Sequence, residues 1–399
     1  MPSFAASSYS SLLSHAKCNV ADVIIASPIV FGRMSMISCM NKLRDIGKYR
    51  LITNGDFDLC EADVFLLDSL VLIDIRNFYF DGLNPNSASG LHQLLVTMSP
   101  NKQVRPDVVF GFALAETCFR QEGFDRLRCR RIYRAVQTVV NWNQEKIDKA
   151  FDSRHPPVKR DKQWEKGKVS IPSPSMLGMD DGDPRSFIMP AYGALLHLLK
   201  LVQGANRHNG VEKFQEHCEW VREELGCVSA YARVIAAALL LGDEASKGKA
   251  RSLLKVDHTR KSLGQKAWNA AWDAWFIQAL DGYRLGMLVP PARLEHQSNY
   301  VGANAVLVTA KDQVWLDSIT DFSVAFSPSA QKEISYPLIC STVTMRNQEA
   351  EKCLEEELRR DKLSFPEHIR NGDLIGKMSR AINNLENELN LPVRSFDVD

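Results

Sequence analysis

The chain has 399 residues, of which 45% are hydrophobic and 24% charged, a composition ordinary for a folded globular protein. Its 49 basic and 48 acidic residues give a net charge of +1, which excludes a protein-wide attraction for nucleic acid or membranes. The nine cysteines show no C-x-x-C spacing, and no apolar run reaches about 18 residues. We therefore expect a cytoplasmic protein with free thiols, no secretory signal and no membrane span.

Short apolar runs predict buried strands in three places. Residues 69–74 (SLVLID) form a compact run that ends in an acid, as is typical of a buried parallel strand. Residues 106–111 predict a second strand or the start of a helix, and residues 112–134 have helical spacing. Residues 304–309 (NAVLVT) repeat the buried-strand pattern. These runs indicate an α/β fold.

The middle and the end of the chain are predicted to be helical. Residues 135–264 have mostly helical patterns, interrupted by a long polar loop at residues 152–185. Residues 267–283 (AWNAAWDAWFIQALDGY) predict a strong helix. Residues 345–392 are charged and helical, with oppositely charged residues four apart. This last segment is expected either to cap the domain or to mediate self-association into a homo-oligomer.

Four acidic residues occur within or directly after apolar sequence. Asp74 closes the predicted strand 69–74, and Asp312 follows the predicted strand 304–309. Glu116 lies in FALAETCF, and Asp273 lies between two tryptophans in AAWDAWF, with Asn269 one turn earlier on the same helix face. Because ligands bind at the carboxyl ends of parallel strands, we expect these acids to converge there.

Convergence of the four acids would explain their apolar surroundings. A buried carboxylate is costly unless it is paired or bound to a metal, and several acids close together repel one another. A divalent cation removes that repulsion, and oxygen ligands favour Mg²⁺ or Mn²⁺. Such a site activates water and stabilises the charge that develops on a phosphate.

Each acid also has an ordinary structural interpretation. Asp74 and Asp312 can cap the helices that follow them. Glu116 can be an exposed helix residue paired with Arg120, four residues later, and Asp273 can pair with a nearby lysine. The order of the four acids along the chain is the stronger argument for a common site.

That order resembles the PIN-like nuclease superfamily, including its NYN branch. The family begins with a buried strand that ends in Asp, closely followed by Asn, and VLIDIRNFYF supplies Asp74 and Asn77 with NYN-like spacing. Its second acid lies in a helix, as Glu116 does in ALAET. Its third acid opens a helix, as Asp273 does in WDAWFIQAL.

The fourth motif of the family is a strand ending in Thr or Ser followed by an acid. Here VLVTAKDQVW supplies Thr309 and Asp312, one residue farther apart than in the usual Thr-x-Asp. Lys311 stands where the family's acid usually stands. The long separation between Glu116 and Asp273 requires a large helical insertion in a domain of this type.

The resemblance implies a three-layer α/β/α fold with a central, mainly parallel sheet, a large α-helical insertion and a helical C-terminal tail. The nuclease domain would span residues 20–134 and 265–330, the insertion residues 135–264 and the tail residues 331–399. It also implies that one or two Mg²⁺ or Mn²⁺ ions activate water for hydrolysis of phosphodiester bonds, in RNA rather than DNA. The implied ligands and their supporting residues are Asp74, Glu116, Asp273 and Asp312, with Asn77, Asn269, Thr309 and Lys311.

Local basic clusters supply the phosphate-binding residues that a nuclease needs. Trp164 adds an aromatic ring for base stacking. The candidates for nucleic-acid binding are Arg128, Arg131, Lys159, Arg160, Lys162 and Trp164. A phosphatase of the haloacid dehalogenase type is disfavoured because Arg76 replaces its second acid. A catalytically inactive PIN-like scaffold or interaction protein remains an open alternative.

Overall fold

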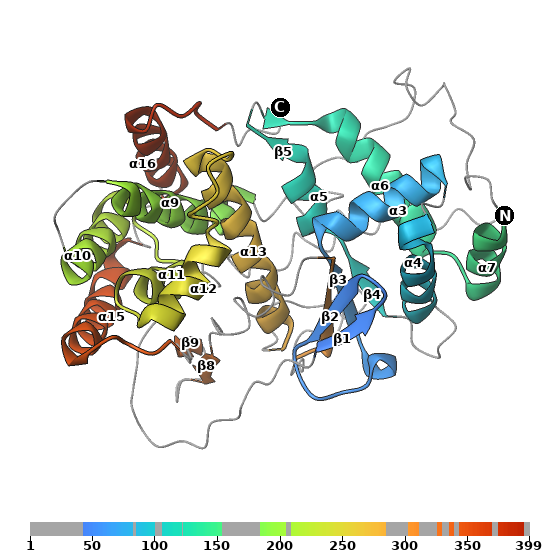
Figure 1. Ribbon diagram of the computed structural model, residues 1–399, viewed down its shortest axis with the longest axis horizontal. Coiled ribbons are helices and arrows are strands. Elements are labelled where there is room, and N and C mark those ends of the chain that lie inside the picture. Colours follow the sequence, from blue (N-terminus) through green and yellow to red (C-terminus); the bar gives the residue numbers. More distant parts are fainter. Residues whose placement is uncertain are drawn as a thin grey trace.

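The computed structural model of the chain contains a five-stranded sheet with helices on both faces (Figure 1). It describes residues 43–82, 85–99, 106–121, 123–153, 184–204, 209–284, 302–310, 325–328, 335–338, 343–368 and 374–394. An α/β fold was expected, and the layered arrangement of helix, sheet and helix is visible in Figure 1.

The sheet is mainly parallel, as expected, with strand order β1-β2-β7-β3-β4. Its strands are β1 (Leu43–Ile46), β2 (Tyr49–Thr53), β3 (Val64–Leu67), β4 (Asp107–Val109) and β7 (Ala305–Thr309). Strand β3 pairs in parallel with β4 and β7, whereas β2 runs antiparallel to β1 and β7. The predicted strands at 106–111 and 304–309 are therefore confirmed.

The predicted strand at residues 69–74 is wrong, because these residues lie in helix α3 (Ser69–Asp81). The buried strand is the preceding segment, β3, and Asp68 separates the two. The Asp68 side chain accepts hydrogen bonds from the backbone N–H groups of Leu70 and Val71, which is a helix N-cap. Buried residues then recur at helical spacing: Val71, Leu72, Ile75, Phe78 and Tyr79.

One face of the sheet is covered by α3 and by the helices that follow it (Figure 1). These are α4 (Pro85–Thr97), α5 (Gly111–Cys118), α6 (Arg126–Val140) and α7 (Gln144–Asp152). The helical pattern of residues 112–134 is divided between α5 and α6. A small hairpin of β5 (Phe119–Arg120) and β6 (Gly123–Phe124) reverses the chain between them. Gly123 has a φ of 118°, a conformation that favours glycine.

Helix α13 (Leu263–Arg284) covers the other face and confirms the helix predicted at 267–283. Around it are α9 (Pro184–Gln203), α10 (Gly210–Trp220), the π-helical turn η3 (Val221–Leu225), α11 (Ala230–Leu240), α12 (Glu244–Leu253), α15 (Gln348–His368) and α16 (Leu374–Glu388). Short elements complete the described chain: η1 (Leu59–Glu61), β8 (Ala325–Pro328) and β9 (Ser335–Leu338). The residues expected to be helical before 264 and after 345 thus contain helices.

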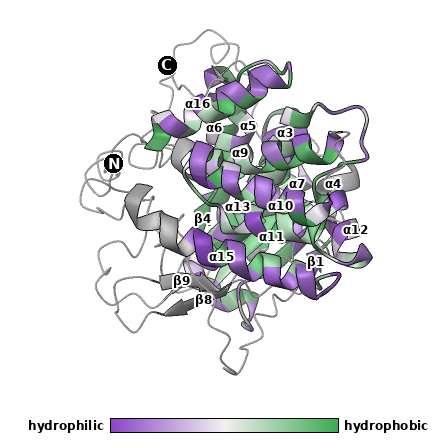
Figure 2. Ribbon diagram, turned by 90° about the vertical axis from the view of Figure 1, so that its left-hand side faces the viewer, coloured by the Kyte–Doolittle hydropathy of each residue, from purple (hydrophilic) through white to green (hydrophobic). Residues whose placement is uncertain are grey.

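The helical half has its own layering. In Figure 2 the coloured ribbons of α12 and α15 are largely hydrophilic, whereas that of α11 is mostly hydrophobic. All residues of α11 from Tyr231 to Leu240 are buried. None of the helices in the described part of the chain combines the length and apolarity that crossing a membrane requires.

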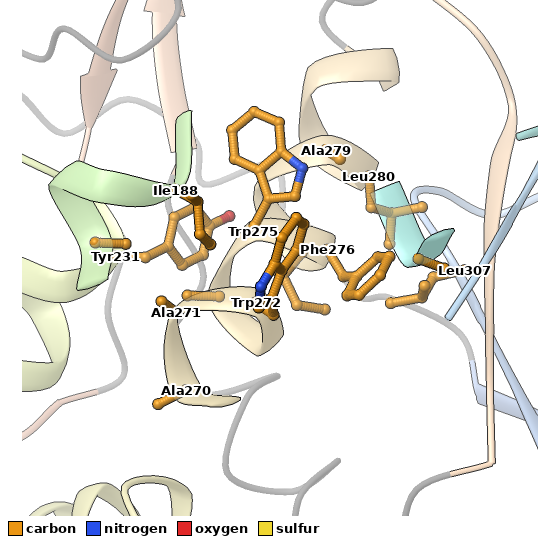
Figure 3. Packing of buried hydrophobic residues seen from close by; sticks show 14 of the residues in the cluster. Ile188, Tyr231, Ala270, Ala271, Trp272, Trp275, Phe276, Ala279, Leu280 and Leu307 are labelled. Carbon is orange, nitrogen blue, oxygen red and sulfur yellow. The ribbon is translucent and has the colours of Figure 1, made fainter. Parts of the chain in front are cut away.

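Helix α13 runs antiparallel to β7. The backbone N–H of Ala303 donates to the carbonyl of Tyr283, which fixes the carboxyl end of α13 beside the start of β7. Gly302 has a φ of 126°, and a Cβ there would lie 2.1 Å from the carbonyl oxygen of Arg284. One turn and two turns earlier on α13, Leu280 and Phe276 pack toward Leu307 of β7 (Figure 3). The amino-terminal half of α13 therefore rises toward the carboxyl edge of the sheet.

Candidate active site at the carboxyl edge of the sheet

Polar residues form a row across four strands at the carboxyl edge of the sheet. Asp45 of β1 pairs with Arg50 of β2, and Arg50 pairs with Thr309 of β7. Asp68 follows the end of β3, and its backbone N–H donates to Val308 over 3.0 Å. The Thr309 hydroxyl donates to the Asp68 carboxylate. Because directly paired residues project to the same face, these side chains share one face.

The row faces helix α13. Leu307 lies two residues before Thr309, on the same face of β7, and it contacts Phe276 (Figure 3). Asp273 lies three residues before Phe276, on the same side of α13 and about 4.5 Å closer to the carboxyl edge. This spacing brings Asp273 to the level of Thr309. Asp273 is only 2% exposed, so its carboxylate belongs to the interior.

Asp68 is held rigidly. Its exposed fraction is 2%, and its Oδ1 accepts from the N–H groups of Leu70 at 2.9 Å and Val71 at 3.1 Å. Its Oδ2 accepts from Thr309, whose side chain is completely buried. The positive end of the α3 dipole stabilises the ionised carboxylate. The result is a carboxylate with a defined orientation at the junction of two parallel strands.

Asp74 has a different role from the one expected. It lies in the second turn of α3, where it accepts a 2.9 Å hydrogen bond from the Tyr49 hydroxyl and pairs with Lys48 Nζ at 2.6 Å. Burial, followed by the charge of Asp74, raises the pKa of Tyr49 well above its usual range. Tyr49 precedes Arg50 on β2 and so projects from the opposite face of the sheet. Asp74 and Asp273 therefore lie on opposite faces and do not share a site.

Glu116 is half-buried in α5, on the side of the sheet that also carries α6. One turn earlier, the ring of Phe112 packs against Trp275 of α13, with 5.5 Å between ring centroids. Among the described residues, however, no group of three or more His, Cys, Asp or Glu side chains is arranged to hold a metal ion. The structure thus does not gather Asp74, Glu116 and Asp273 into one cluster.

The predicted supporting residues have mixed outcomes. Thr309 is adjacent to the strand-end acid, although that acid is Asp68. Asn77 accepts a 3.1 Å hydrogen bond from Arg76 Nε within α3. Asn269 is half-buried one turn before Asp273. Lys311 and Asp312 lie outside the described residues.

The predicted nucleic-acid-binding residues are also only partly described. Arg128 and Arg131 are half-buried in α6. Residues 154–183 lie outside the described ranges, and these include Lys159, Arg160, Lys162 and Trp164.

Two members of the polar row, Asp68 and Arg50, were not predicted from the sequence. Asp68 was recognisable as an acid between an apolar tetrapeptide, VFLL, and a helical pattern. Arg50 had no comparable signal, because its position depends on the pairing of β2 with β7. No protein-family model, curated protein or solved structure matches the chain, so a functional assignment depends on this geometry.

Proposed function

We propose that the chain is a metal-dependent nuclease that hydrolyses phosphodiester bonds, with RNA as the preferred substrate. Its active site is the carboxyl edge of the sheet, and Asp68 takes the place that Asp74 was expected to have. The observation that carries the proposal is the hydrogen-bonded pair of Asp68 and Thr309, on adjacent parallel strands, at the level of Asp273 on α13.

The side chains present fit Mg²⁺ or Mn²⁺. Asp68 and Asp273 offer carboxylate oxygens and Thr309 offers a hydroxyl, which are ligand types that these hard cations prefer. Asp312 follows Thr309 by three residues and is the candidate for a further oxygen ligand. When bound, the cation stabilises negative charge on the phosphate and lowers the pKa of water.

The chain's own residues prepare the site for a cation. Two buried carboxylates at the same level of the sheet repel each other, and a cation between them relieves that repulsion. Thr309 acts as a positioning residue, because its hydroxyl fixes the orientation of the Asp68 carboxylate. With Asp68 as the first acid, the chain order of Asp68, Glu116, Asp273 and Thr309 follows that of the PIN-like motifs, but no Asn closely follows Asp68 and Glu116 lies on the other side of the sheet.

Helix α6 is basic and covers the face of the sheet opposite to α13, so its arginines would contact a polyanion away from Asp68 and Thr309. It contains five arginines and no acidic residue, and its N-cap Asp125 accepts from the N–H of Arg128. Arg128 and Arg131 remain the candidates for phosphate contacts on this helix. Such contacts contribute affinity that decreases as the salt concentration rises.

A matched pair of substitutions tests the proposal. Asp68→Asn keeps an N-cap residue but removes the charge, so the fold should survive while cleavage falls about a hundredfold or more. Asp74→Asn makes the same chemical change on the other face and should leave cleavage unchanged. The measurement is cleavage of labelled single-stranded RNA and DNA in Mg²⁺ or Mn²⁺, with EDTA as a blank. Wild-type protein that cleaves neither substrate, or Asp68→Asn protein that cleaves normally, would contradict the proposal.

A non-catalytic scaffold is the second candidate function. It is favoured by the three hydrogen bonds that Asp68 already accepts within the protein, because a helix cap together with a tie between neighbouring strands would explain them. A scaffold should bind nucleic acid or protein without cleavage in any divalent metal. The cleavage assay on the wild type therefore separates the two candidates.

A further inference from the structure

We infer that Arg50 binds the scissile phosphate of the substrate, an inference that rests on the proposed nuclease function. Arg50 lies on β2, where it is directly paired with Thr309. Its side chain is 25% exposed, so a ligand can reach the guanidinium. The residue thus lies in the same polar row as the acid pair, on the side of Thr309 away from Asp68.

The order of residues across the sheet suits a phosphate. Arg50, Thr309 and Asp68 occupy three adjacent strands, and neighbouring strands are about 4.8 Å apart. Thr309 is completely buried, so a phosphate held by Arg50 would lie at the exposed edge of the row, with the guanidinium on one side and the proposed acid-bound cation on the other. Charge on its non-bridging oxygens would then be stabilised from both directions.

The guanidinium is oriented and still has hydrogen-bonding capacity. Nη1 pairs with Asp45 Oδ2 at 2.6 Å, which fixes the plane of the group. Nε is buried and has no hydrogen-bond partner in the described part of the chain. A buried donor without an acceptor is costly, and a phosphate bound at the exposed part of the guanidinium would offset that cost. Arginine is suited to this because its planar fork matches phosphate geometry.

A purely structural role for Arg50 makes different predictions. The pair with Asp45 joins an exposed carboxylate to a half-buried guanidinium, and such pairs add little stability. If that pair were the whole function, lysine at position 50 would preserve it. Phosphate binding instead requires the arginine fork, and lysine supplies only a point charge.

The test compares Arg50→Gln and Arg50→Lys with Arg44→Gln, a control on β1. Arg44 precedes Asp45, so it projects from the opposite face, where it pairs with Asp58 at 2.9 Å. All three variants should melt close to the wild type. Arg50→Gln should reduce kcat on RNA about a hundredfold, Arg50→Lys about tenfold, and Arg44→Gln not at all. Unchanged kcat in Arg50→Gln would overturn the inference.

Inorganic phosphate provides a readout that is independent of activity. In Mn²⁺, phosphate should raise the melting temperature of the wild type and of Arg44→Gln, but not that of Arg50→Gln. If the wild type cleaves no RNA but phosphate still raises its melting temperature and not that of Arg50→Gln, the nuclease proposal is wrong and the phosphate site is supported. If phosphate raises the melting temperature of Arg50→Gln as much as that of the wild type, the proposed phosphate site is wrong, whether or not the protein cleaves RNA.

Discussion

The two halves of the molecule treat buried charge in different ways. In the helical half, Arg222 of η3 lies 2.7 Å from Glu357 and 2.9 Å from Asp361, both on α15. Arg233 of α11 lies 2.9 Å from the same Asp361. At the sheet edge, by contrast, Asp68 is held by N–H and hydroxyl groups, which are neutral donors. Opposite charges cancel in the first case, whereas N–H and hydroxyl groups fix the orientation of the carboxylate in the second.

The difference separates a region stabilised by paired charges from the region where we propose a cation site. A neutralised network fixes how α15 packs on α11 and η3, and it has little attraction for another ion. An oriented carboxylate presents its oxygens in a defined direction, as the proposed cation site requires. Substitutions in the helical half should therefore act mainly on the free energy of unfolding, and substitutions of Asp68 mainly on activity.

The largest effect on stability is expected from Asp361→Ala. This change leaves the buried guanidinium groups of Arg222 and Arg233 without their shared carboxylate, which should cost about 3–5 kcal/mol of unfolding free energy. Urea denaturation at neutral pH measures the loss. The matched control is Glu244→Ala, which breaks the exposed pair with Lys247 on α12 and should not move the urea midpoint. A loss below about 1 kcal/mol for Asp361→Ala would remove the contrast between the halves.

A smaller effect is expected from pH, through His197 of α9 and His217 of α10. Their Nδ1 atoms are 3.3 Å apart, and the His197 ring stacks on Trp220. Burial, helped by the charge of Lys200, lowers the pKa of His197 to about 3, and burial together with Arg233 lowers that of His217.

The sign of the pH effect follows from these lowered pKa values. Below pH 6.5 the unfolded chain takes up protons at both histidines while the folded chain does not, so stability decreases as pH falls from 6.5 toward 3. Between pH 7 and pH 5.5 the loss should be about 2–3 kcal/mol, because each pH unit below 6.5 costs about 1.4 kcal/mol for each histidine. Urea denaturation at the two pH values checks this. His197→Phe, which keeps a ring on Trp220, should flatten the dependence, and an equal slope in both proteins would refute the assignment.

The smallest effect is expected from Asp74→Asn. The pair with Lys48 is partly exposed, and the Tyr49 hydroxyl can still donate to the asparagine oxygen. The free energy of unfolding should therefore change by less than about 1 kcal/mol. Thermal and urea melts check the value. A larger loss would mean that the sheet edge also depends on charge cancellation, and the two halves would then differ less than proposed.

The apolar pattern was sufficient to predict β4, β7 and α13, since each combines the expected length with clear boundaries. It failed at residues 69–74, because a short apolar run fits a buried strand and a buried helix equally well. The deciding feature was local: Asp68 caps the helix, and the buried positions continue at helical spacing to Tyr79. The acid that follows the buried strand is therefore Asp68, six residues before the predicted Asp74.

The rest of the site depends on strand neighbours that the sequence does not reveal. Thr309 and Asp68 are 241 residues apart, and their contact exists because β7 inserts beside β3. Arg50 enters the row only because β2 is antiparallel to β7 in one particular register. Asp74 and Asp273 were expected to lie together. Asp74 bonds Tyr49, whereas Arg50 belongs to the row that faces the helix of Asp273, and these two neighbouring strand residues project to opposite faces of the sheet.

The insertion of β7 between β2 and β3 also has a consequence for folding. Only a short connection separates the end of β2 at Thr53 from the start of β3 at Val64. In the sheet, however, these two strands are not neighbours, because β7, which begins at Ala305, lies between them. Contacts between such distant residues form slowly, because a long loop must close before they stabilise anything. Until β7 arrives, β2 and β3 expose edges that can pair with other chains. The row of Arg50, Thr309 and Asp68 is completed by that same insertion, so an incompletely folded chain has no assembled site.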